Sequence, residues 1–69
     1  MTGAIEFKGW SHFRSIKLRP GLFSQVYRNS EGWTAQEVFS GPKNRPLGLI
    51  VHDEQGELIG MVKTVSDLP

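Results

Sequence analysis

Aromatic and cationic side chains alternate in residues 7–21, FKGWSHFRSIKLRPG, which carry more recognisable chemistry than any other stretch. Aromatic rings stack on nucleic-acid bases and cations follow the phosphates, which is how small β folds bind single strands. The stretch therefore predicts a surface for single-stranded nucleic acid that uses Trp10, Phe13, Arg14, Lys17 and Arg19. In the alternative interpretation Trp10 and Phe13 fill the core of a small β domain, which leaves only dispersed cations at the surface.

The two histidines, His12 and His52, are the candidates for acid–base chemistry. His52, Asp53 and Glu57 resemble an acid–base cluster, but the turn sequence around them predicts a solvated hairpin tip. Ser11 precedes His12 without a carboxylate to orient the pair. The chain has no cysteine, and two isolated histidines do not make a metal site. We therefore expect no enzymatic activity, no catalytic residue, no metal and no cofactor.

Two matched segments, VYRNSEGWTA and LIVHDEQGELIG, predict β-hairpins. Each has an apolar run, a four-residue polar stretch that starts with Asn or Asp and ends with Gly, and a second apolar run. Folding the first segment at its turn sets Arg28 opposite Trp33, a cross-strand cation–π pair. Folding the second sets His52 opposite Glu57 and Val51 opposite Leu58. One face of this hairpin then forms a core stripe of Leu47, Leu49, Val51, Leu58 and Val62.

The segment SGPKNRPLG, residues 40–48, predicts a stiff basic loop between the hairpins, because two prolines and two glycines disfavour strand and helix. Loops on a rigid sheet often carry recognition, and exposed edge strands accept a partner strand or pair two copies into a homodimer. These features predict a non-enzymatic module that binds another protein and modulates or assembles a larger complex. Its candidate binding residues are Arg28, Trp33, Lys43, Arg45 and Pro46. Nucleic-acid binding is the alternative function.

The order of these segments predicts a single all-β domain over residues 1–69. No segment has a sustained helical period, and SDLP near the end favours one helical turn at most. Two hairpins plus N-terminal strands give a five- or six-stranded barrel or curled antiparallel sheet, similar to SH3 domains.

Charge is unevenly distributed although the formal net charge is only +1. Residues 1–28 hold five basic residues and one acidic residue, and residues 29–69 hold three basic and six acidic residues. This asymmetry fits a basic face for a polyanion, two faces that attract each other in an oligomer, or basic strands packed beside acidic ones. The lack of cysteine, of a signal-peptide pattern and of a membrane-length apolar run predicts a cytoplasmic protein of a prokaryote or phage without membrane insertion.

Residues 47–68, LGLIVHDEQGELIGMVKTVSDL, resemble the opening hairpin of PRC-barrel domains. The resemblance lies in the run G-x-x-V-x-D-x-x-G-x-x-I/L-G-x-V, matched here by Gly48, Val51, Asp53, Gly56, Leu58, Ile59, Gly60 and Val62. It implies a binding module that serves an RNA-processing or membrane-complex assembly without catalysis. In that family the hairpin opens the domain, whereas here it lies at the end of the sequence.

Overall fold

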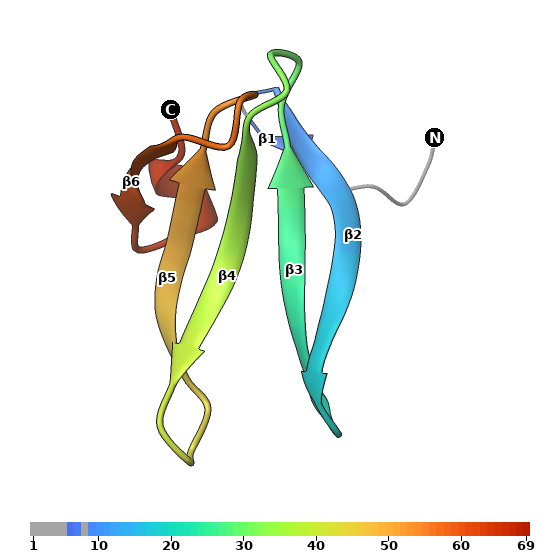
Figure 1. Ribbon diagram of the computed structural model, residues 1–69, viewed down its shortest axis with the longest axis vertical. Helices are drawn as coiled ribbons and strands as arrows, with labels where there is room; N and C mark the ends of the chain where they lie inside the picture. Colours follow the sequence, from blue (N-terminus) through green and yellow to red (C-terminus); the bar gives the residue numbers. More distant parts are fainter. Residues whose placement is uncertain (1–5, 8) are drawn as a thin grey trace.

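A computed structural model describes residues 6–7 and 9–69 and shows one antiparallel sheet whose six strands lie in chain order (Figure 1). The strands are β1 (Glu6–Phe7), β2 (Trp10–Arg19), β3 (Leu22–Arg28), β4 (Thr34–Ser40), β5 (Arg45–His52) and β6 (Leu58–Val62). A 3-10 helix, η1 (Val65–Asp67), follows β6, as the SDLP segment predicted. The all-β class and the curled antiparallel sheet are confirmed. The sheet does not close into a barrel, because β1 and β6 remain its two edges.

Both predicted hairpins form, and an Asx side chain organises each turn. Asp53 Oδ1 accepts hydrogen bonds from the backbone amides of Gln55 at 2.9 Å and Glu57 at 2.8 Å. Gly56 closes the turn with a φ of 84°, a conformation in which a side chain is strained. Asn29 organises the β3–β4 turn through the same pair of amide contacts. The sequence pattern therefore identified these turns for the correct physical reason.

The register of the first hairpin differs from the prediction by one residue. The turn glycine occupies a bulge position, so the amide of Asn29 bonds the carbonyl oxygen of Trp33 at 3.1 Å. Arg28 consequently pairs with Thr34. The predicted Arg28–Trp33 cation–π pair is wrong, and the Arg28 guanidinium instead lies 4.9 Å from the centre of the Phe13 ring.

The second hairpin shows the same shift and a further bulge. His52 pairs with Leu58 and Val51 pairs with Gly60, so the predicted His52–Glu57 and Val51–Leu58 pairs are wrong. A shift of one residue moves a side chain to the opposite face of a sheet, and Leu58 is 64% exposed. The predicted core stripe is correct for Leu49, Val51 and Val62, and wrong for Leu47 and Leu58.

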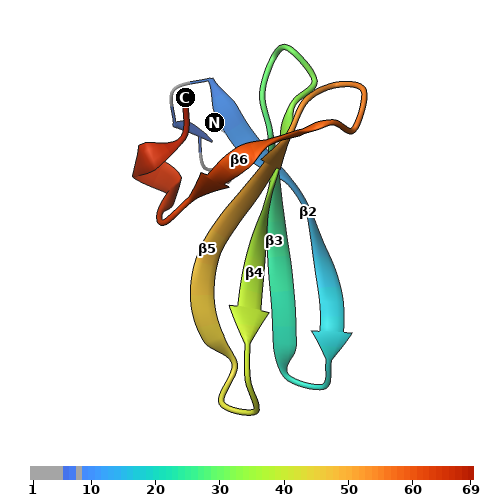
Figure 2. The ribbon, with the colours of Figure 1, turned by 60° about the vertical axis from the view of Figure 1, so that its left-hand side comes forward.

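The main buried cluster lies on one face of the sheet, here called the inner face, near the end that carries the β3–β4 and β5–β6 turns. Figure 2 shows β6 and η1 turning across this end of the sheet. The buried cluster consists of Trp10, Tyr27, Ala35, Leu49, Val51 and Leu68. Trp10 is 1% exposed, and its indole nitrogen donates a hydrogen bond to the main-chain oxygen of Pro69 at 2.8 Å. The tail after η1 therefore completes the core with Leu68, which the sequence did not predict.

The predicted loop over residues 40–48 is shorter than expected. β4 extends to Ser40 and β5 begins at Arg45, so only residues 41–44 form the turn and Pro46 belongs to a strand. Proline is tolerated there because β6 pairs with β5 only from Leu49 onward, which leaves the start of β5 with one neighbouring strand.

Candidate functional site

Alternate turns of an antiparallel meander lie at opposite ends of the sheet. The β2–β3 and β4–β5 turns share one end, and the β3–β4 and β5–β6 turns share the other (Figures 1 and 2). We call the first the basic end, made of residues 17–23 and 39–47. We call the second the acidic end, made of residues 29–33 and 53–57.

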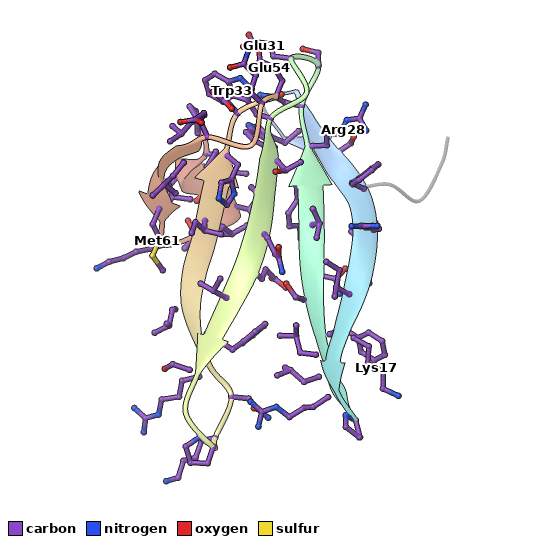
Figure 3. The ribbon with its side chains drawn as sticks, in the orientation of Figure 1. Lys17, Arg28, Glu31, Trp33, Glu54 and Met61 are labelled. Atoms are coloured by element: carbon purple, nitrogen blue, oxygen red, sulfur yellow. The ribbon has the colours of Figure 1, made fainter. Side chains whose placement is uncertain are left out.

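The basic end carries Lys17, Arg19, Lys43 and Arg45, all of them exposed, and its two segments contain no acidic residue. The acidic end carries Glu31, Asp53, Glu54 and Glu57, and its two segments contain no lysine or arginine. Within the described part of the chain, none of the four cations forms an ion pair. Lys17 lies at one end of the molecule and Glu31 and Glu54 at the other (Figure 3). Basic and acidic turns alternate along the chain, and the meander therefore gathers them at opposite ends of the molecule.

The two basic tips are separate because the sheet splits between β3 and β4. The β3–β4 ladder covers only three pairs and ends at Val26 and Gln36. Beyond it, side chains replace ladder contacts: the buried Ser24 hydroxyl donates to the Glu37 carbonyl oxygen at 2.6 Å, and the Gln25 amide donates to Glu37 Oε1 at 3.0 Å. The β2–β3 and β4–β5 hairpins therefore diverge toward the basic end, as Figure 1 shows.

Apolar side chains accompany the cations at the basic end. Leu18, Phe23 and Leu47 are 46%, 49% and 50% exposed. A small pocket of about 120 Å³ on the inner face is lined in part by Phe39 and Pro46 of the 39–47 segment. Exposed apolar surface next to unpaired charge is typical of an interaction site, because burying it stabilises a complex while the charges select the partner.

The structure divides the predicted protein-binding set between the two ends. Lys43, Arg45 and Pro46 lie at the basic end, whereas Arg28 lies near the acidic end and Trp33 within it (Figure 3). Trp33 is half-buried and packs against the core cluster. These five residues therefore do not form one surface.

The predicted nucleic-acid set is divided as well. Trp10 is buried in the core, so its ring is not available to a base. Phe13 is 47% exposed, and the guanidinium of Arg14 lies 5.8 Å from its ring centre, on a surface that Arg28 shares. The ring also lines an open pocket of about 420 Å³ at the start of β2. Lys17 and Arg19 lie at the basic end instead, and the side chains of Phe7 and Lys8 are outside the described part of the chain.

A polar cluster on the inner face joins His12, Ser15, Gln25 and Tyr27. His12 Nε2 lies 2.7 Å from Gln25 Oε1, and the Ser15 hydroxyl donates to the same oxygen at 2.6 Å. The His12 ring meets the Tyr27 ring edge-on, with 5.9 Å between their centres. Burial, and secondarily the Glu37 carboxylate, raises the pKa of the Tyr27 hydroxyl. The hydrogen-bond partner of the imidazole is thus an amide oxygen rather than a carboxylate.

His52, Asp53 and Glu57 lie at one turn, but within the described residues no hydrogen bond or ion pair joins their side chains to one another. Asp53 uses its carboxylate to organise its own turn, and His52 lies beside Leu58. No group of three or more His, Asp or Glu residues that would suit a metal ion occurs among the residues that the structure describes.

Comparison with known protein families, with curated proteins and with solved structures found no match for this chain. In residues 6–7 and 9–69, no helix has the length and apolar character needed to cross a bilayer. The functional proposal therefore rests on the separation of basic and acidic residues at opposite ends of the molecule, and on the exposed apolar side chains of the basic end.

Proposed function

We propose that the protein is a non-enzymatic protein-binding module that helps to assemble or modulate a larger complex. In this proposal the basic end holds an acidic segment of a partner protein that also presents apolar side chains. The observation that carries the proposal is that each tip of the basic end combines two unpaired cations with exposed leucine or phenylalanine side chains and has no acidic residue.

The energetics favour recognition by several weak contacts. A solvent-exposed ion pair contributes only about 0.2–1 kcal/mol, so charge alone gives a weak complex. Burying Phe23, Leu18 or Leu47 adds roughly 25 cal/mol for each Å² of apolar surface removed from water. Because Lys43 and Arg45 form no ion pair within the described chain, a partner carboxylate displaces no existing contact when it binds.

Reversing two charges at the basic end tests this proposal. Peptides selected from a random displayed library on the purified protein are expected to be rich in Asp and Glu beside Leu or Phe. The double variant Lys43→Glu/Arg45→Glu should bind the selected peptides at least about tenfold more weakly in fluorescence anisotropy, a loss of about 1.4 kcal/mol. The matched control Glu31→Lys/Glu54→Lys reverses two charges at the acidic end and should retain binding. Peptides without acidic bias, or equal binding by both variants, would contradict the proposal.

A second candidate function, binding of single-stranded nucleic acid, is favoured by the environment of Phe13. The guanidinium groups of Arg28 and Arg14 lie 4.9 Å and 5.8 Å from the centre of this exposed ring, and the ring borders an open pocket. An aromatic ring flanked by arginines offers one stacking site and two phosphate contacts. The proposed surface therefore consists of Phe13, Arg14 and Arg28 and does not include the buried Trp10 side chain.

Titration with labelled single-stranded DNA and RNA, followed by anisotropy at low and physiological salt, tests the second candidate. Binding through Phe13, Arg14 and Arg28 should weaken with salt, with a slope of about −0.7 for each phosphate contacted. Phe13→Ala should abolish it, and Lys43→Glu/Arg45→Glu should reduce it less. An absence of binding at low salt would exclude this function, and protein binding would remain as the proposed function.

A further inference from the structure

We infer that a second copy of this chain supplies the acidic segment: the β5–β6 turn of one molecule docks on the basic end of the next. This inference rests on the proposed function, since it names the partner of the same site. The result is head-to-tail self-association in which each molecule uses a different surface at each end.

The β5–β6 turn has the chemistry that the basic end requires. Glu54 and Glu57 are exposed, and neither carboxylate forms an ion pair within the described residues. Leu58 and Ile59 follow directly and are 64% and 45% exposed. The turn thus presents acidic groups beside apolar side chains, and its Asx-stabilised backbone is already ordered, which reduces the entropy lost on binding.

The other acidic turn fits the basic end less well. Residues 29–33 contribute a single carboxylate, that of Glu31. Arg28, immediately before this turn, adds a positive charge, and Trp33 is packed against the core. Because the β5–β6 turn holds three of the four acids and two exposed apolar neighbours, we assign the contact to it.

The opposite charges cannot satisfy each other within one molecule. The basic and acidic ends lie at opposite extremes of the longest dimension, which is 34 Å (Figure 3). Salt screens exposed charges beyond about 8–10 Å at physiological ionic strength. Attraction between the ends is therefore effective only between copies, and a net charge of +1 gives little overall repulsion against it.

The contact is expected to be weak and sensitive to salt. Two turns docking on each other bury less surface than the roughly 1,200 Å² at the lower limit of stable interfaces. The apparent mass of the wild-type protein in sedimentation velocity should rise with protein concentration in low salt, and fall toward the monomer in about 0.15 M salt.

Mixing two complementary variants gives the decisive test. Lys43→Gln/Arg45→Gln removes two charges from the basic end, and Glu54→Gln/Glu57→Gln removes two charges from the acidic turn, so neither variant gains a surface of opposite charge. Each variant alone should self-associate at least about tenfold more weakly than wild type. A mixture should form a 1:1 heterodimer that grows no further, since each variant retains the surface that the other lacks. Lys63→Gln removes an exposed cation outside both ends and should assemble like wild type, and circular dichroism confirms that each variant is folded.

Each other outcome overturns the inference in a recognisable way. Wild-type protein that stays monomeric but binds selected acidic peptides excludes the second copy and leaves the proposed function intact. Variants that still associate alone would place the contact elsewhere, for example between two β6 edges. If neither peptides nor a second copy bind the basic end, the inference and the proposed function fail together.

Discussion

Trp10→Ala is expected to leave the protein largely unfolded at 25 °C. The side chain is 1% exposed, contributes the largest apolar group of the buried cluster, and holds the tail through its bond to Pro69. Truncating a buried tryptophan costs about 3–5 kcal/mol. The single core of a domain of 69 residues rarely supplies more than about 3–5 kcal/mol of stability, so this single loss approaches the whole.

Urea denaturation followed by far-ultraviolet circular dichroism measures this effect. The wild type should show a cooperative transition, and Trp10→Ala should have little or no folded baseline. Phe13→Ala is the matched control, because it removes an aromatic ring three residues away on the same strand that is 47% exposed. It should cost about 1 kcal/mol or less, as for surface substitutions. Equal stability of the two variants would contradict the buried position of Trp10.

The second large effect is expected for Gly48→Ala. Gly48 has a φ of 139°, and a Cβ at this position would overlap the carbonyl oxygen of Val62. A side chain in this backbone region costs about 1–3 kcal/mol in strain. The overlap comes from backbone rather than a flexible side chain, so β6 must also shift away from β5. We expect the combined loss to exceed that strain alone.

Gly60→Ala is the matched control for Gly48→Ala, because it adds the same methyl group to the neighbouring strand. No atom lies within 4 Å of a Cβ placed there, and Gly60 does not have a positive φ. The melting temperature should therefore fall markedly for Gly48→Ala and change little, or rise, for Gly60→Ala. Similar melting temperatures would show that β6 does not pass close to Gly48.

The sequence predicted local structure well and long-range geometry poorly. The turns at Asn29 and Asp53 were predictable because their side chains act on amides two and four residues away. The register was wrong because one glycine in each turn occupies a bulge, which no alternation pattern reveals. That one-residue error transferred Leu58 from the expected core to the surface.

Which residues are buried in the core depends on long-range contacts, and the alternation of apolar and polar residues along a strand does not reveal them. Trp10 shares the parity of Ile16 and Leu18, yet only Trp10 is fully buried. Irregularities in the β2–β3 pairing, between His12 and Arg14 and between Lys17 and Arg19, break the alternation. Leu68 is buried because η1 returns the tail to the inner face, and a short tail has no periodicity from which this could be inferred.

Parts of the candidate site were predictable individually but not as a group. Lys17 and Arg19 were assigned to nucleic acid, and Lys43 and Arg45 to a protein partner, because they are far apart in the sequence. Their common location follows because alternate turns of a meander lie at the same end of the sheet. The positions of those turns could be predicted from the glycine and proline residues in the sequence. Comparing charges between alternate turns, rather than between halves of the chain, would have revealed the basic end.

The bond between Trp10 and Pro69 also has a consequence for how the molecule folds. It joins residues 59 positions apart, whereas every strand pairs with its neighbour in the chain. Local hairpins form quickly, while bringing distant segments together requires a costly loop closure. The ladder of hairpins should therefore be largely formed at the rate-limiting barrier, before the tail docks. Loosening the tail then shortens the lifetime of the native state and leaves the speed of its formation almost unchanged.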